Sequence, residues 1–398
     1  MNIKEDKSHV YIITLTLLLL VGAGGFFLKM YQLYTEKQPQ QQQQEIPTRQ
    51  HELEALYSQE AMPAAPEGAD PRDYGLTEDA PEGAPDGFIF FSTVPVNTRA
   101  LTQIYALDVT KQQSDAVSLI PDRARSGFAE FTDKDAPSDF FLNTIDENYA
   151  DDADKDGTRI QELDAETGTF KTFTSATGTY EQSIAYAKES KRLAFNRLGV
   201  PFRSYTDLVP IRNWEVVITD PEKDTLLTVI PGAVQPKWSP DGEKLVYLKA
   251  DGLYVYDLKN ATETKAVTAT EGQILATSKM DVSPDGKYLI TTVAKAGIII
   301  VSEITSWEPF TLKELGRIQG TGTEYYWPQF SYDSKYYVVQ AIDAALPGSV
   351  DRLHPRFEIR PIMSRTIVQS IPIDAFNFEA FFTDTWVKSL PAIKKEGE

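Results

Sequence analysis

The chain has 398 residues, 41% of them hydrophobic, and combines 19 tyrosines and 20 phenylalanines with no cysteine. The lack of thiols excludes disulfides, cysteine-ligated zinc and lipid-modified cysteine anchors. The formal net charge of −19 argues against nucleic acid as a partner, because its phosphates would be repelled.

The N-terminal part predicts a membrane anchor and a tether. After a tail of residues 1–9, residues 10–28 form an uncharged apolar run. At about 1.5 Å per residue it is long enough to cross a hydrocarbon core of about 30 Å. A cleaved signal peptide is the alternative. Residues 29–86 are rich in Gln, Pro, Ala and Glu, which predicts a disordered linker. We therefore expect a single-pass signal-anchor with the body outside the cytoplasm, in the periplasm or at the cell surface.

The folded body is expected over residues 87–390, with 391–398 as a C-terminal tail. Runs of β-branched and aromatic residues bounded by turn residues predict strands, and these strands fall into six groups. The first two groups comprise strands 88–94, 102–109, 128–131, 139–145, 159–163 and 169–174, and the other four occupy 183–230, 233–270, 279–318 and 326–373.

A short turn motif repeats along the second half of the chain. Ser239-Pro240-Asp241-Gly242 has the residues of a type I turn, and it recurs at Ser283, less clearly at Ser331, and faintly at Ala187. These points are about 44 to 52 residues apart, which is typical of four-stranded propeller blades. The sequence therefore predicts an all-β, six-bladed β-propeller, with seven blades as the alternative.

Ring closure is also predicted. The first group lacks the strand that precedes the turn in the other blades, and Glu379–Asp384 resembles Pro328–Asp333. We expect a C-terminal strand to pair into the first blade, which would hide sheet edges that otherwise promote aggregation.

The repeats resemble a known family. The stretches Trp238–Tyr247 and Val282–Ile290, with their Ser-Pro-Asp-Gly turns and following apolar strands, are similar to the WD40-like (PD40) repeat of TolB-type bacterial propellers. The resemblance covers about residues 186–339. It implies a propeller fold, which in similar proteins serves as an envelope scaffold or as a non-catalytic domain of peptidases. The small α/β domain that precedes the TolB propeller is not expected here, so the TolB partners are not carried over.

Few residues suggest catalysis. His9 and His51 precede the predicted body, which leaves His354, and no Gly-x-Ser-x-Gly nucleophile motif is present. We predict a protein that is not an enzyme. A carboxylate-dependent carbohydrate-active or other hydrolytic propeller is the alternative, because the chain has 58 acidic residues.

One acidic loop resembles a calcium site. Asp152, Asp154 and Asp156, followed by Gly157, match the opening of a calcium-binding loop, but Leu163 stands where a bidentate glutamate is needed. A weak Ca²⁺ site and a hydrated acidic loop are both open, and no other cofactor is expected.

Long connections predict the binding surface. Between the second and third strands they are long in the first, second, third and sixth groups, and such connections emerge on one face of the disc, here called the long-loop face. Arginine and aromatic residues are enriched at interaction hot spots. The candidate residues are Arg197, Arg203, Tyr205, Arg212, Trp214, Arg352, His354 and Arg356. The alternative is that Trp214 belongs to the core and that the arginines pair with local acids.

The combined prediction is a membrane-tethered, non-catalytic β-propeller that binds or scaffolds another protein, or an envelope polymer, through the long-loop face. A small-molecule substrate is not expected. The alternatives are the hydrolytic enzyme above and a structural subunit of a membrane assembly.

Overall fold

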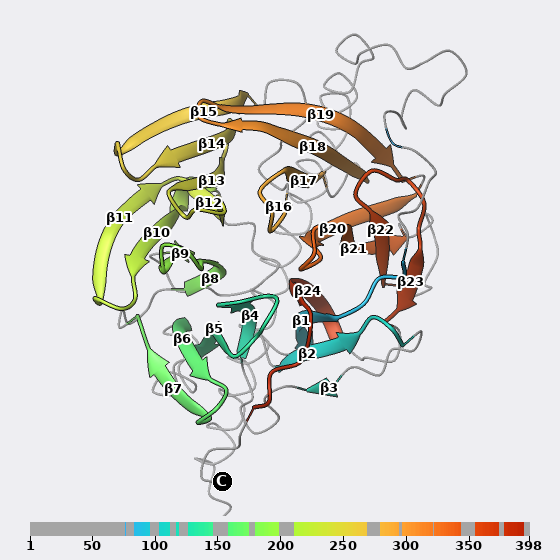
Figure 1. The fold of residues 1–398 in the computed structure, drawn as a ribbon, viewed down its shortest axis with the longest axis horizontal. Coiled ribbons are helices and arrows are strands. Elements are labelled where there is room, and N and C mark those ends of the chain that lie inside the picture. The colour runs from blue at the N-terminus through green and yellow to red at the C-terminus, as the bar shows by residue number, and fades with distance from the viewer. Residues whose placement is uncertain are drawn as a thin grey trace, which may run out of the picture. The chain divides into compact units, whose positions relative to one another are not determined.

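The computed structural model describes residues 76, 83–95, 103–111, 117–118, 126–145, 158–174, 180–198, 211–268, 279–293, 297–320, 322–343, 355–373 and 378–393. They form six four-stranded antiparallel sheets, and each sheet is one blade (Figure 1). The predicted membrane segment, residues 10–28, lies outside these ranges. Within them, no helix is long and apolar enough to cross a membrane.

The blades follow the predicted groups closely. Blade one contains β24 (Phe378–Val387), β1 (Phe88–Pro95), β2 (Gln103–Asp108) and β3 (Val117–Ser118). Blade two contains β4 (Ser126–Phe131), β5 (Asp139–Ile145), β6 (Thr158–Asp164) and β7 (Thr169–Thr172). Blade three contains β8 (Tyr180–Ala187), β9 (Arg192–Leu198), β10 (Trp214–Asp220) and β11 (Thr225–Pro231), with a 3₁₀ turn at Ile211–Asn213 before β10.

The remaining blades repeat the same order. Blade four contains β12 (Ala233–Trp238), β13 (Lys244–Lys249), β14 (Gly252–Asp257) and β15 (Thr262–Thr268). Blade five contains β16 (Lys279–Val282), β17 (Tyr288–Val293), β18 (Ile298–Trp307) and β19 (Phe310–Gln319). Blade six contains β20 (Thr323–Phe330), β21 (Tyr336–Asp343), β22 (Arg356–Pro361) and β23 (Gln369–Pro372).

The innermost strands close a ring. Strand β24 contacts β4, and the contacts continue through β8, β12, β16 and β20 back to β24. The last strand of the chain completes the blade that the first strand begins, because β24 pairs with β1. The six-bladed propeller and its closure are thus confirmed.

The predicted register of the closing strand is wrong. The sequence comparison aligned Asp384 with the turn residue Asp333, but β24 continues to Val387, which lies opposite Phe88. Asp384 is a buried residue inside the strand, at a β-bulge. The innermost strands of other blades, β4, β8, β12 and β20, also contain bulges, so a short sequence match does not fix where the closing strand ends.

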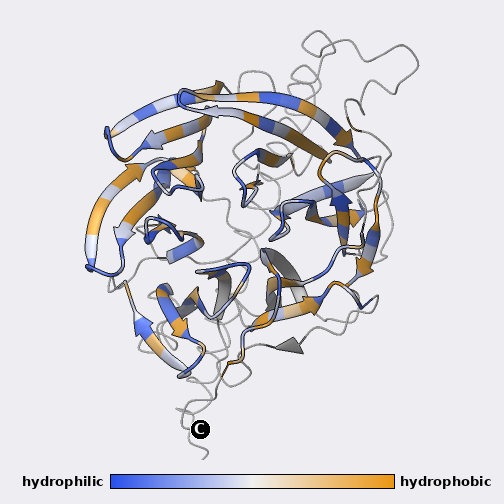
Figure 2. Cartoon of the chain, viewed as in Figure 1, coloured by the Kyte–Doolittle hydropathy of each residue, from blue (hydrophilic) through white to orange (hydrophobic). Residues whose placement is uncertain are grey.

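The core is divided among the blade interfaces. Six apolar clusters are present in the described residues, and each joins residues of neighbouring blades. Phe90 and Phe131, for example, meet edge to face between blades one and two with ring centroids 4.7 Å apart. Figure 2 shows apolar and polar residues alternating along outer strands such as β19. This alternation lets one face of each blade pack against the next.

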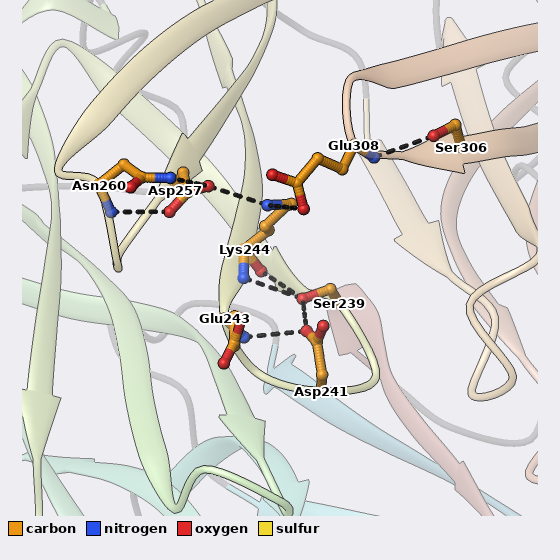
Figure 3. A network of polar contacts seen from close by, with 8 residues as sticks. All are labelled: Ser239, Asp241, Glu243, Lys244, Asp257, Asn260, Ser306 and Glu308. Carbon is orange, nitrogen blue, oxygen red and sulfur yellow. Dashed lines mark hydrogen bonds and ion pairs between the residues drawn. The ribbon is translucent and has the colours of Figure 1, made fainter.

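The Ser-Pro-Asp-Gly turn is a hydrogen-bonded corner between the first and second strands of blade four (Figure 3). The hydroxyl of Ser239 accepts the Lys244 N–H at 2.9 Å, and Gly242 donates to the Ser239 carbonyl at 2.9 Å. The ammonium of Lys244 reaches Asp257 of β14 at 2.9 Å. This hydrogen bond lowers the pKa of Asp257 to about 2.

Successive turns also contact one another around the ring. A Cβ placed on Gly286 in blade five would lie 2.2 Å from the Cγ of Pro240 in blade four. The Asp285 N–H donates to the Ser334 hydroxyl in blade six at 3.1 Å. The face that carries these corners is here called the turn face.

The end of the predicted linker is attached to the propeller. Leu76 is 5% exposed within the apolar cluster of blades five and six. The Gly83 carbonyl accepts the Tyr336 hydroxyl at 2.7 Å, and the Asp86 carbonyl accepts the Trp386 indole N–H at 2.8 Å. These contacts span blades five, six and one.

Candidate functional site

Four of the eight predicted surface residues are described. Arg203, Tyr205, Arg352 and His354 lie outside the described residues, as do the calcium-loop candidates Asp152, Asp154 and Asp156. In the part of the chain that the structure describes, no group of three or more His, Cys, Asp or Glu residues could hold a metal ion.

In blade three, the predicted residues lie together on β9, β10 and the preceding turn. Arg197 forms an ion pair with Glu215 on the neighbouring strand at 2.6 Å. Trp214 is 7% exposed and packs edge-on against Tyr180, at 6.1 Å between ring centroids. Arg212 is exposed on the 3₁₀ turn. Of these three residues, only Arg212 offers an exposed side chain.

In blade six, Arg356 begins β22 and is already engaged. Its guanidinium lies 2.9 Å from Asp343 and 2.8 Å from Glu358. Glu358 also accepts from Arg360 at 2.8 Å. Arg197 and Arg356 therefore have local carboxylate partners, and the long-loop face stays a prediction.

A cavity lies on the turn face, opposite the long-loop face. It has a volume of about 360 Å³ and is lined by inner-strand ends and corner residues of blades two to six, including Glu130, Lys188, Glu189, Ser239 and Tyr332. We call it the turn-side cavity.

Every lysine that lines the turn-side cavity has a carboxylate partner. Lys237 and Asp281 are 2.7 Å apart, and Lys188 and Asp133 are 2.6 Å apart. Lys134 lies 3.6 Å from Glu130. Two of these ion pairs cross blade boundaries. Lys188 follows β8 of blade three, whereas Asp133 follows β4 of blade two. Lys237 belongs to β12, whereas Asp281 belongs to β16.

Asp281 is the most enclosed of these groups. Its side chain is 2% exposed, and its second oxygen accepts the Phe330 N–H of blade six at 2.8 Å. Blades four, five and six are therefore joined by one carboxylate. Glu130 is 7% exposed, and burial raises the pKa of its carboxyl above the ordinary value.

A smaller cavity of about 30 Å³, here called the inner cavity, adjoins the first along the axis. Lys237 lines both cavities, and Trp327, Gln329, Thr383 and Asp384 line the inner one. Three side-chain oxygens there have no hydrogen-bond partner among the described residues: Oε1 of Gln329, Oγ1 of Thr383 and Oδ1 of Asp384. Burial raises the pKa of Asp384 well above its usual value, although Ser92 donates to its other oxygen.

These axial residues were missed at the sequence level, but a signal exists. In the three repeats that keep the turn serine, the residue two positions before it is polar: Lys237 before Ser239, Asp281 before Ser283, and Gln329 before Ser331. Each lies on an innermost strand. Alternate residues of that strand face the axis.

No protein-family model matches the chain, and no curated protein matches its sequence. Solved structures that resemble it include a TolB candidate from Agrobacterium tumefaciens, with 13% identity, a TM-score of 0.44, and coverage of 78% of this chain and 94% of that chain. An oligogalacturonate lyase from Vibrio parahaemolyticus has 12% identity, a TM-score of 0.43, and coverage of 73% and 80%. Kuenenia stuttgartiensis hydrazine synthase has 14% identity, a TM-score of 0.42, and coverage of 61% of this chain and 64% of that chain. This chain thus spans less than two thirds of the length of that synthase chain. The propeller assignment itself rests on the strand pairing.

Proposed function

We propose that this chain is a non-catalytic β-propeller that binds a polar segment of a partner protein in its turn-side cavity. Residues 10–28 hold it at a membrane, with the propeller on the extracytoplasmic side. The pairing of charges in the cavity carries the proposal. Each lysine there has a carboxylate partner, so the walls offer both ammonium donors and carboxylate acceptors held in place by ion pairs. Preorganised polar groups of both charges favour recognition of a complementary partner.

Site-specific crosslinking tests where the partner docks. A photoreactive amino acid replaces Glu189, which is exposed at the turn-side cavity, in the full chain in its own membrane. The matched control places it at Leu227, which is 44% exposed on the outer strand of blade three. We expect one defined protein to crosslink from position 189 and not from 227. A third variant carries the photoreactive amino acid at Arg212. Crosslinking from position 212 alone would place the partner on the long-loop face and refute docking in the turn-side cavity.

Charge reversal gives an independent test. K188E breaks the exposed ion pair with Asp133, which costs no more than about 1 kcal/mol of folding free energy. We expect capture of the crosslinked partner to fall several-fold while the unfolding midpoint stays close to that of the wild type. Unchanged capture would argue against a role for the cavity.

A second candidate function follows from Glu130. A carboxyl that is buried beside a cavity and has a raised pKa is suited to act as a general acid, as in carboxylate-dependent hydrolysis. A glycan panel tests this. Hydrolysis by the wild type that is abolished in E130Q would favour the enzyme over the binding module.

A further inference from the structure

Lys279 differs from the other lysines near the axis. It is the first residue of β16, and its Nζ lies 4.0 Å from the ring centroid of Trp327 on β20. Among the described residues no carboxylate forms an ion pair with it, whereas Lys237 has Asp281. Burial lowers the pKa of its ammonium to about 8, although part of the side chain remains exposed.

The ring of Trp327 does not replace a counter-ion. A cation–π contact contributes about 0.5 to 2 kcal/mol. Taking an ammonium out of water costs several kcal/mol even after the protein relaxes. The site is therefore stabilised by any anion that can approach the ammonium of Lys279.

A second donor lies beside Lys279. Thr292 is its partner in the β16–β17 register, which places both side chains on the same side of the sheet. The hydroxyl of Thr292 is fully buried and has no hydrogen-bond partner among the described residues. A buried hydroxyl without a partner costs about 1 to 3 kcal/mol, and an anionic oxygen would satisfy it.

Trp327 connects this pair of donors to the inner cavity. It lines that cavity together with the partnerless oxygens of Gln329, Thr383 and Asp384. The amide and carboxyl oxygens accept hydrogen bonds from N–H or O–H donors, which a bound guest can supply. The surroundings of Trp327 thus call for an anionic group on the Lys279 side and for hydrogen-bond donors in the inner cavity.

We propose that Lys279, Thr292 and Trp327 receive the carboxylate of an amino acid or of the C-terminal residue of a peptide, whose N–H groups bond to the oxygens of the inner cavity. A carboxylate fits better than a phosphate, because the chain carries a net charge of −19 and the carboxylate of Asp281 lies close to the axis. A doubly charged anion would be repelled more strongly. This inference rests on the proposed binding function for the peptide nature of the ligand.

Two small probes that differ in one group test the inference. N-acetylglycine presents a carboxylate beside an amide N–H, and N-acetylglycinamide lacks only the charge. Titration calorimetry of the full chain is expected to show tighter binding of N-acetylglycine by at least about tenfold. That preference should shrink as the pH rises above about 8, where Lys279 loses its proton.

Variants separate the two halves of the site. K279M keeps the aliphatic stem and should abolish the preference for the carboxylate, whereas K279R should retain it. Q329L should weaken both probes alike. Equal binding of the two probes by the wild type, an unchanged preference in K279M, or no binding of either probe would overturn the inference.

The probe titrations and the crosslinking experiment can fail independently of each other. Binding of N-acetylglycine without any protein crosslinked from position 189 would support the carboxylate site and refute protein docking. A crosslinked partner together with no binding of either probe would do the reverse.

Discussion

The contact between Gly286 and Pro240 predicts that the repeated turns stabilise one another across blade boundaries. Gly286 has φ of +69°, and an added Cβ would lie 2.2 Å from Cγ and 2.6 Å from Cδ of Pro240. Proline cannot rotate away, because its ring fixes φ and the side chain together. G286A must therefore displace one corner from the other.

The expected cost of G286A has two parts. Placing a residue with a Cβ in the left-handed region costs about 1 to 2 kcal/mol. Overpacking a tight contact adds about 1 to 3 kcal/mol. Gly322 isolates the first part, because it has φ of +76° and a Cβ there would meet nothing within 4 Å. We expect G286A to cost more unfolding free energy than G322A by about 1 to 3 kcal/mol.

Urea denaturation followed by tryptophan fluorescence measures both variants. A double-mutant cycle with P240A completes the experiment, because removing Cγ and Cδ opens the space that the new Cβ needs. P240A should relieve most of the excess cost of G286A. If G286A and G322A cost the same, or if the cycle shows no coupling, the corners do not support one another.

Three further predictions concern the closing strand, a buried acid and the linker. W386A should destabilise the protein by about 3 to 5 kcal/mol, since the indole is fully buried and donates to Asp86, and a loss below about 1 kcal/mol in denaturant would contradict ring closure through this residue. Burial raises the pKa of Glu181 to about 7, so the wild type should lose up to about 3 kcal/mol as the pH rises from about 4.5 to 7, because the folded state keeps a proton that the unfolded state releases. E181Q should lack this slope in pH-dependent unfolding, and an equal slope would refute the assignment. L76A should cost about 2 kcal/mol in the same denaturation assay, whereas no measurable change would show that Leu76 adds nothing to the propeller.

Much of the fold could be predicted because the conformation of the turn motif depends only on the residues within it. Ser239, Pro240 and Gly242 specify the corner through their own backbone preferences, and the spacing of the copies sets the size of a blade. The position of the closing strand was predicted as well, but its register was not. Asp384 lies at a bulge, and a bulge depends on how β24 meets its neighbours rather than on β24 alone.

The candidate site was less predictable. Trp214 and Arg197 looked like surface residues because arginine and aromatics are common at interfaces, but their burial and pairing depend on which strands lie beside them. The charged residues around the axis were also missed, because their partners lie on strands that are distant in the sequence. Lys237 and Asp281 are 44 residues apart in the sequence and 2.7 Å apart in space.

The sequence by itself determined the blade, because hydrogen bonds within a turn and alternation along a strand are short-range properties of neighbouring residues. Through the spacing of the repeats it also predicted six blades, and the pairing of the strands decided against the alternative of seven. Only the tertiary structure decided what surrounds the axis. There, side chains from six strands far apart in the chain share one small space, and the pairing or isolation of each charge, as at Lys279, depends on that shared space.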